Sequence, residues 1–415
     1  MKLQKGSSMK IAEIEIHELQ NIPITPPLFK EPVRAAVRLL EIKTDNGITG
    51  ISQIGGFMHS ATIAFIRNDL APWLKGKDPL ETERLMHQML WKFNTRAHGG
   101  VWNFAVSAID VALWDIKGKF YNAPVWRLLG AAQKSVPAYI TFGLRAYSKD
   151  ALAEAAKHWV TKGQTRLKIQ VGRLNVRGEM DPSGAGAEHR EDNPSVDEGR
   201  VRAVREAVGD NVELMVDANC LMKYDAALRW SKRFEPYNLM WFEEPIVHND
   251  RRLLAELRKQ TSIPIAAGQW DSFFALSDLV KEKAVDFLNI HVLSVGGFTM
   301  GMKAAGVAHA FNLPVGNGDC AIVDQPERIA GRFLEGCDPA VDEQPVPHVH
   351  RLRRALLLRS KSERLAQSFR SHRRNRDDSA GGARRSSACG RFGDDWTVRS
   401  GSRTPSPDPA PDRTL

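Results

Sequence analysis

Long hydrophobic runs and clustered cysteines are both missing from this chain of 415 residues. No stretch of about 18 apolar residues could cross a membrane, and the N-terminus lacks the apolar centre of a secretory signal, so we expect a soluble cytoplasmic protein. The cysteines have neither metal-ligand nor paired spacing, which argues against a disulfide framework and favours reduced thiols. The four are Cys220, Cys320, Cys337 and Cys389.

An excess of one charge is also absent from most of the chain, although the net charge is +9. Residues 1–350 hold 42 basic and 42 acidic side chains, whereas 351–415 hold fifteen Arg and one Lys against seven Asp and Glu. This basic tail has little hydrophobic periodicity, which is typical of disordered segments. We expect a solvated appendage, with a polyanion-binding arm as the alternative, and nucleic-acid binding is not expected of the rest of the chain.

The first part of the chain has the pattern of an α+β unit, predicted over residues 9–133. From Met9, IAEIEIHELQ alternates apolar and polar residues, and VRLLEIKTDNGITGIS indicates two strands joined by an Asp-Asn-Gly turn. Helical spacing of apolar residues follows at 60–75, 80–93 and 101–118. The glycine pair Gly55-Gly56 lacks the pattern of a phosphate-binding turn, so a nucleotide site is not expected.

From residue 134, short apolar runs alternate with amphipathic helices, which predicts a parallel β/α barrel over 134–318. No convincing eighth strand follows the seventh run, and we assign 319–350 to an uncertain C-terminal segment and 351–415 to the tail. A natural appendage and a shifted reading frame both explain this loss of pattern. The seven runs begin at residues 136, 166, 212, 239, 263, 287 and 313.

Oxygen-bearing side chains end successive predicted strands of the barrel. Asp217 follows VELMV, Glu243 and Glu244 follow LMWF, and Gln269 follows IPIAAG, so that 26 residues, one β/α unit, separate Asp217 from Glu243 and Glu243 from Gln269. Strand ends of a barrel meet at one mouth, and oxygen ligands suit Mg²⁺. The alternative for each acid alone is a helix cap or an ion pair.

Two further side chains at the predicted mouth could move a proton. Lys168 lies on the strand before Asp217, where a nearby dication would lower its pKa, and it could act as a base or hold a substrate carboxylate. His291 ends the FLNIHV strand and could exchange protons near neutral pH. The alternatives are a surface lysine and a structural histidine.

The stretch AVSAIDVALWDIKGKFYNAPVWRLLG, Ala105 to Gly130, resembles the signature before the barrel in the mandelate racemase and muconate lactonizing enzyme family of the enolase superfamily. VDAN, WFEEP, AAG and the Val295-Gly296-Gly297 turn also match, and the resemblance covers roughly Met9 to Gly318. It implies an α+β capping domain, a modified barrel, and Mg²⁺-assisted removal of a proton next to a carboxylate, with the enediolate stabilised by the metal and its neighbours.

Residue by residue, the resemblance makes Asp217 and Glu243 metal ligands and Lys168 the first lysine of a Lys-x-Lys pair. Four positions depart from the family's pattern. Gln170 replaces the second lysine and Gln269 the third ligand carboxylate, which should weaken metal binding. His291 and Gly318 stand where many members have an Asp-His dyad, so the two-base machinery of racemisation is missing. A long polar loop between Gln170 and Asp217 could be a lid or a surface insertion.

We therefore predict a Mg²⁺-dependent lyase that dehydrates a sugar acid. The substrate would be a small carboxylate, with His291 as acid or base, Lys168 as carboxylate clamp, and Asp217, Glu243 and Gln269 around the metal. The alternatives are a non-catalytic or weakly active descendant, or a racemase or cycloisomerase. The resemblance also implies a homo-oligomer.

Overall fold

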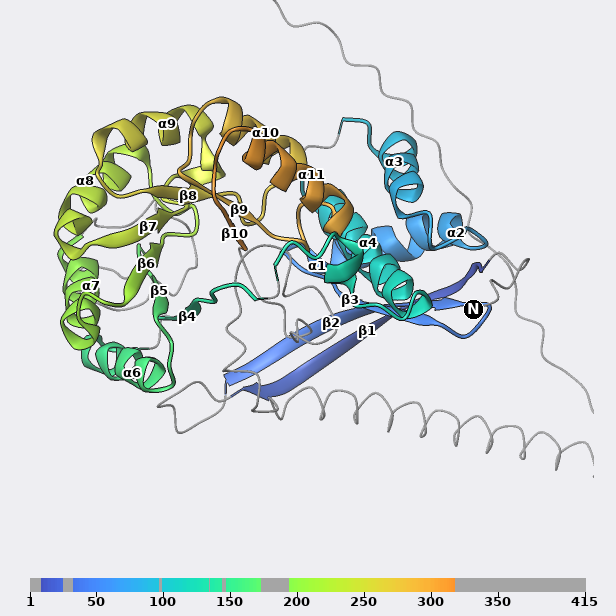
Figure 1. Ribbon diagram of the computed structural model, residues 1–415, viewed down its shortest axis with the longest axis horizontal. Coiled ribbons are helices and arrows are strands. Elements are labelled where there is room, and N and C mark those ends of the chain that lie inside the picture. Colours follow the sequence, from blue (N-terminus) through green and yellow to red (C-terminus); the bar gives the residue numbers. More distant parts are fainter. Residues whose placement is uncertain are drawn as a thin grey trace, which may run out of the picture. The chain divides into compact units, whose positions relative to one another are not determined.

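The computed structural model describes residues 9–24, 33–96, 99–133, 135–143, 147–172 and 194–317 (Figure 1). All of them belong to the first of the two units into which the chain divides, residues 1–349. Most of the polar loop after Gln170, Gly318, the segment 319–350 and the tail lie outside these residues, and the predictions made for them stay predictions. No helix in the described ranges is both long enough and apolar enough to span a membrane.

The described N-terminal strands form an antiparallel sheet in the order β1-β2-β3, with β1 Ile11–Ile24, β2 Val33–Thr44 and β3 Thr49–Gln53. β2 and β3 are joined by the predicted Asp-Asn-Gly turn, in which the Thr44 N–H donates to the Ile48 carbonyl over 3.0 Å. Gly47 has a φ of +86° in this turn, a conformation that favours glycine. The hairpin expected from the sequence is confirmed.

Helices cover this sheet where the spacing of apolar residues predicts them. The longest, α4, is apolar on nearly every face because it packs at once on β3 and on α11, the helix Gly297–Ala310 that follows a strand of the second sheet. β3 approaches α4 closely, since a Cβ on Gly50 would lie 2.1 Å from the Ala112 carbonyl oxygen. The helices are α1 His59–Phe65, α2 Ala71–Leu74, α3 Thr82–Phe93, α4 Val101–Phe120 and α5 Val125–Leu128, with a π-helical segment Ile66–Leu70 between α1 and α2.

Within the described residues, the second sheet holds seven parallel strands in sequence order, as predicted. They are β4 Ile140–Gly143, β5 Arg166–Gln170, β6 Glu213–Asp217, β7 Leu239–Glu243, β8 Ile265–Ala267, β9 Phe287–Ile290 and β10 Val315–Asn317. The intervening helices are α6 Lys149–Thr161, α7 Pro194–Val208, α8 Tyr224–Phe234, α9 Arg251–Gln260, α10 Phe273–Lys281 and α11 Gly297–Ala310, with 3₁₀ turns at Glu235–Tyr237 and Val247–Asn249.

This sheet curls with its helices along the outer side (Figure 1). The Tyr139 hydroxyl, just before β4, donates to the Asn317 carbonyl of β10 over 2.8 Å, so the first and last strands come within reach of one side chain. The prediction of a barrel-type α/β fold with an α+β cap is confirmed, while the domain bounds 9–133 and 134–318 stay predictions.

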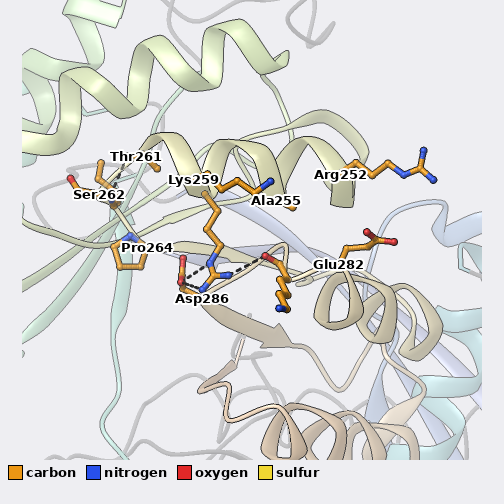
Figure 2. A pocket seen from close by; sticks show the side chains of 11 residues that line it. Arg252, Ala255, Lys259, Thr261, Ser262, Pro264, Glu282 and Asp286 are labelled. Carbon is orange, nitrogen blue, oxygen red and sulfur yellow. Dashed lines mark hydrogen bonds and ion pairs between the residues drawn. The ribbon is translucent and has the colours of Figure 1, made fainter.

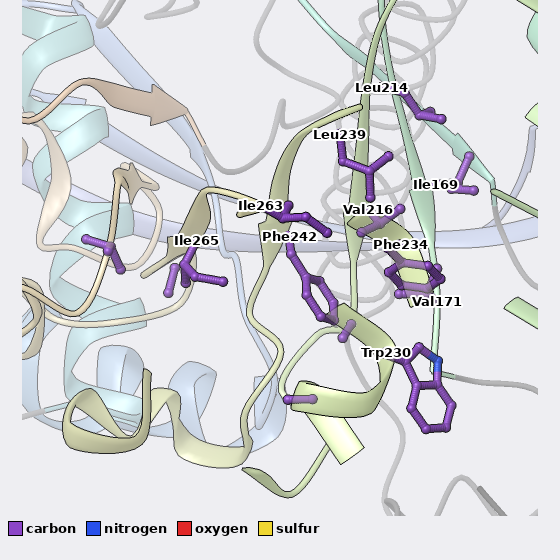
Figure 3. Packing of buried hydrophobic residues seen from close by; sticks show 14 of the residues in the cluster. Ile169, Val171, Leu214, Val216, Trp230, Phe234, Leu239, Phe242, Ile263 and Ile265 are labelled. Carbon is purple, nitrogen blue, oxygen red and sulfur yellow. The ribbon is translucent and has the colours of Figure 1, made fainter. Parts of the chain in front are cut away.

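Alternation along the strands decides which side chains face the interior of the curl. Ile169, Val216 and Phe242 pack outward with helix residues such as Trp230 in the main hydrophobic core (Figure 3). Because successive side chains of a strand point to opposite faces, the neighbours Lys168, Asp217 and Glu243 point inward. A smaller apolar cluster of Met215, Trp241 and Ala266 lies on that inner face.

The signature helix α4 docks onto the start of α11 through buried polar contacts. Ser107 Oγ accepts from the Gly296 N–H over 2.9 Å, and the Asp110 carboxylate accepts from the N–H and the hydroxyl of Thr299 over 3.0 and 2.6 Å. A Cβ on Gly297 would lie 2.2 Å from Asp110 Oδ2, so glycine is required there. Burial raises the pKa of Asp110 to about 7, even though the Thr299 bonds act to lower it.

Replacing this carboxyl group should change how stability depends on pH. The folded pKa of Asp110 lies above its ordinary value of 3.8, so the unfolded state ionises first and the folded state loses stability as pH rises from about 4 to 7. Relative to Asp110→Asn, the free energy of unfolding of the parent should fall by roughly 1.4 kcal/mol per pH unit in this window. Urea titrations from pH 4 to 7, with exposed Asp69→Asn as control, test this, and a difference independent of pH would contradict it.

Candidate active site

The predicted site residues on β5, β6 and β7 come together at the carboxyl ends of these strands. Gln170, Asp217 and Glu243 are in register across the three strands. Lys168 pairs with Met215 two residues before this level, on the same face of the sheet. The Lys168 side chain extends to the carboxylates, with its Nζ 2.6 Å from Glu243 Oε2 and 3.2 Å from Asp217 Oδ2. All three charged side chains are buried, so they form one internal ion-pair cluster.

The carboxylate oxygens of this cluster are unequally engaged. Glu243 Oε2 also accepts from the Trp241 indole N–H over 3.0 Å, and Asp217 Oδ1 accepts from the Asn219 backbone N–H over 2.8 Å. Glu243 Oε1 is buried and has no hydrogen-bond partner within the described residues. One carboxylate oxygen is therefore available to a further group.

Burial and mutual charge set the protonation of the cluster. Burial, and then repulsion from Asp217, raise the pKa of Glu243 to about 8, although Lys168 acts in the opposite direction. Burial alone would lower the pKa of Lys168, but Glu243, Tyr139 and Asp217 together raise it well above its ordinary value. The neighbouring carboxylates therefore favour the protonated form of the Lys168 side chain.

Gln269 follows β8 and is held by the neighbouring strand. Glu244 Oε1 accepts from the Gln269 N–H over 3.1 Å, the Gly268 N–H over 3.4 Å and the Asn249 side-chain amide over 3.0 Å. Glu244 adopts a left-handed conformation with a φ of +42°, which turns its side chain away from the direction taken by Glu243. Glu244 and Asn249 thus act as positioning residues that the sequence alone did not reveal.

The donor set of the predicted metal site is suited to a hard divalent cation. Gln269 Oε1, like Glu243 Oε1, is a buried acceptor without a partner among the described residues, and carboxylate and amide oxygens are ligands that Mg²⁺ takes. Only two of the predicted ligands, Asp217 and Glu243, are charged. In the described part of the chain, the one cluster of three acidic or imidazole ligands lies elsewhere, on the N-terminal sheet: Glu15, His17 and Glu41.

His291 lies just after β9 and is fully buried. Neither ring nitrogen has a hydrogen-bond partner in the described part of the chain, and the ring stands edge-on to Trp270 with 4.6 Å between centroids. Burial lowers the pKa of His291 to about 3. The expectation that this histidine keeps an ordinary pKa is wrong, because the surrounding side chains exclude the water that would stabilise its charge.

Asn289 is a polar residue of the inner face that we did not single out from the sequence. It is fully buried two residues before His291, and neither atom of its amide has a partner within the described ranges. A Cβ on Gly316 would lie 2.5 Å from Asn289 Oδ1, so glycine on β10 provides the space. The alternation in FLNIHV, which puts Asn289 and His291 on one face, was the available signal.

Trp270, whose ring contacts His291, also contacts two aromatic rings of the N-terminal part, Phe57 and Phe104. The Trp270 ring lies 5.5 Å from Phe57 and 6.1 Å from Phe104 between centroids, and Phe57 is 65% exposed. A Cβ on Gly56 would lie 2.4 Å from the Phe104 ring, and the φ of Gly56 is +81°. The close approach at Gly56 therefore brings the loop before α1 near Trp270 at the mouth of the barrel.

Gln170 occupies the ligand layer without taking part in the ion pairs. Its side-chain amide N–H donates to Asn219 Oδ1 over 3.2 Å, and its backbone carbonyl accepts from the Arg200 guanidinium over 2.8 Å. The neutral amide adds no charge beside Asp217. Gly318, the other departure noted in the sequence, lies outside the described residues.

A groove of about 640 Å³ lies at the opposite, amino-terminal end of β8 and β9 (Figure 2). Arg258 of α9 donates to Asp286 over 2.7 Å and to the Lys283 carbonyl over 3.1 Å, so its guanidinium is used within the fold. Barrel enzymes carry their chemistry at the carboxyl ends of the strands. We therefore assign this groove no part in the candidate site.

The chain matches two family descriptions over most of its described length. The mandelate racemase / muconate lactonizing enzyme N-terminal domain matches residues 27–130, and the enolase C-terminal domain-like family matches residues 151–330. The chain belongs to the mandelate racemase and muconate lactonizing enzyme family of the enolase superfamily, which confirms the resemblance seen in the sequence.

Curated relatives of this chain include dehydratases and cycloisomerases. D-galactarolactone cycloisomerase of Agrobacterium fabrum is 30% identical over 308 residues, covering 72% of this chain and 76% of the relative. L-talarate/galactarate dehydratase of Salmonella typhimurium is 31% identical over 288 residues, covering 67% and 66%. Arabinonate dehydratase of Saccharolobus solfataricus is 28% identical over 286 residues, covering 66% and 70%.

Solved structures of similar fold include two that contain magnesium. L-talarate dehydratase from a Polaromonas species, complexed with Mg and L-glucarate, aligns with a TM-score of 0.63 at 30% identity, covering 75% of this chain and 81% of the other. A racemase from Streptomyces coelicolor with bound magnesium aligns with a TM-score of 0.64 at 26% identity, covering 75% and 84%.

The burial of His291 under Trp270 can be tested directly. In Trp270→Ala, water should reach the imidazole, and its pKa should rise from about 3 toward the ordinary value of about 6.5. Histidine NMR titration measures this, with the resonance assigned by its loss in His291→Asn. The exposed-tryptophan variant Trp91→Ala is the control, and an unchanged pKa in Trp270→Ala would show that the ring is not what excludes water.

Proposed function

We propose that this protein is a Mg²⁺-dependent lyase that dehydrates a sugar acid, starting with removal of a proton from the carbon next to the carboxylate. The observation that carries the proposal is the buried cluster of Lys168, Asp217 and Glu243, together with two buried acceptors, Glu243 Oε1 and Gln269 Oε1, that have no hydrogen-bond partner among the described residues. The sugar-acid dehydratases among the relatives support the choice of reaction.

Asp217, Glu243 and Gln269 would hold the Mg²⁺. Bound there, the ion would supply positive charge that makes the proton next to a carboxylate more acidic. The carboxylates are partly neutralised by Lys168, and Gln269 adds an oxygen without charge, so weak binding is expected.

Lys168 would act as the clamp for the substrate carboxylate. Its ion pairs keep the side chain protonated, and an ammonium has three donors for carboxylate oxygens. A fixed cation also makes the binding of an anion in this dry interior less costly. Lys168 would therefore bind and orient the substrate rather than take its proton.

His291 would be the group that moves the proton. As a neutral imidazole it has one nitrogen free to accept, and the negative charge of a bound substrate would favour its protonated form. It could take the proton next to the carboxylate and give it to the departing hydroxyl, so that water is the only product lost. One proton-transfer face is sufficient for this reaction, whereas racemisation needs a group on each face.

A descendant that binds a carboxylate without turning it over is the second candidate. It is favoured by the Trp270 ring over His291 and by the neutral Gln170 in the ligand layer. A cytoplasmic location and a homo-oligomeric assembly complete the proposal, on sequence grounds alone.

A screen of acid sugars for dehydration, with and without Mg²⁺, tests the proposed reaction. We expect turnover of at least one sugar acid that depends on Mg²⁺ and is lost in Asp217→Asn, because a carboxylate ligand is removed. In the same assay His291→Asn should lower kcat by roughly 10²-fold or more, while Lys168→Met should mainly raise KM.

The exposed-histidine variant His309→Asn serves as the control and should retain full activity. Exchange of the two kinetic effects would exchange the roles of Lys168 and His291. Full activity in both variants would reject the site, and carboxylate binding without turnover of any acid sugar would favour the second candidate.

A further inference from the structure

The Lys168 side chain is committed to the same carboxylates that are proposed to bind the metal. Its ammonium lies 2.6 Å from Glu243 and 3.2 Å from Asp217, and 5.1 Å from the centre of the Tyr139 ring. Only 2% of the residue is exposed. The Lys168 ammonium is thus a buried cation in direct contact with both carboxylates.

The contacts of Lys168 reduce the number of carboxylate oxygens that are available to a metal ion. Asp217 Oδ1 is engaged by the Asn219 N–H, while Asp217 Oδ2 and Glu243 Oε2 face the ammonium. Among the carboxylate oxygens, Glu243 Oε1 alone has no partner within the described residues. A divalent cation that collects six or more oxygen ligands would have to share or take over those held by Lys168.

The charge of the site leads to the same conclusion. In the ionised forms that would bind a metal, Asp217 and Glu243 together with Lys168 carry a net charge of −1, and the strand-end residues Gln170 and Gln269 add none. Each unit of positive charge next to a dication in a buried site costs free energy, because water does not screen it. Lys168 should therefore weaken metal binding through both charge and occupied oxygens.

We propose that Lys168 is a tethered cation that competes with a divalent metal ion for Asp217 and Glu243 and thereby sets the metal affinity of the barrel mouth. The inference rests on the proposed function, in that the two acids are its metal ligands. It adds that Lys168 lowers the metal affinity, so that the site fills only at high metal concentration.

Calorimetric titration of the full chain with Mn²⁺ and with Mg²⁺ tests this competition without any turnover. Lys168→Met should bind Mn²⁺ at least about tenfold more tightly than the parent, because two oxygens are released and a positive charge is lost. The exposed-lysine variant Lys162→Met should bind as the parent does, and Lys168→Arg should stay weak because it keeps the charge. Equal or weaker binding by Lys168→Met would overturn the proposal.

A second variant separates competition for oxygens from charge alone. Gln269→Glu also makes the net charge −2 but leaves the ammonium in place, so its gain in affinity should be smaller than that of Lys168→Met. A gain in Gln269→Glu with none in Lys168→Met would overturn the proposal, since the ammonium would then not compete.

Lys168→Met leaves two buried acids without a cation and could fail to fold in metal-free buffer. Urea unfolding over a range of Mn²⁺ concentrations covers this case. An ion that binds only the folded state raises the free energy of unfolding by an amount that depends on its affinity. The variant should gain stability at lower Mn²⁺ than the parent, and no gain would overturn the proposal. An inactive parent with the expected order of affinities would reject the dehydratase and keep this inference.

Discussion

The buried contact between one ammonium and two carboxylates is the constraint on which the candidate site depends. Taking three charges out of water is costly, and the cost is offset only while they remain together. Loss of Lys168 would leave Asp217 and Glu243 as unpaired buried charges, a change worth roughly 3–5 kcal/mol in other buried ion pairs. The site is therefore held by charge balance, and any divalent cation that enters must alter that balance.

The arrangement of strands makes this contact possible. Lys168, Asp217 and Glu243 come from β5, β6 and β7, whose parallel register brings the two acids to one level and sets the lysine one step deeper. The alternate residues of the same strands enter the apolar core, so a one-residue slip would bury apolar side chains in the mouth and charges against the helices. Packing of the core therefore also fixes the charged cluster.

The strands and the oxygen-bearing side chains at their ends could be predicted because their signals are local. Short apolar runs followed by Asp217, Glu243 and Gln269 at steps of 26 residues need only the regular period of a β/α barrel. The burial of His291 could not, since it depends on Trp270 and on rings brought to the mouth by another part of the chain. The Asp110 contact with α11 joins residues 189 apart and gives no local pattern. Glu244 was read as one of two strand-end acids, and only the fold shows that it positions Gln269 instead.

The central claim is that the strand ends around Glu243 form the cation site of this protein. Anomalous diffraction from crystals grown with Mn²⁺ tests it most directly, because the ion is located without reference to activity. The account predicts an anomalous peak bonded to Glu243 and Asp217, with Gln269 or water completing the ligands. A peak only at Glu15, His17 and Glu41 on the N-terminal sheet, or none at the barrel mouth at saturating Mn²⁺, would contradict it.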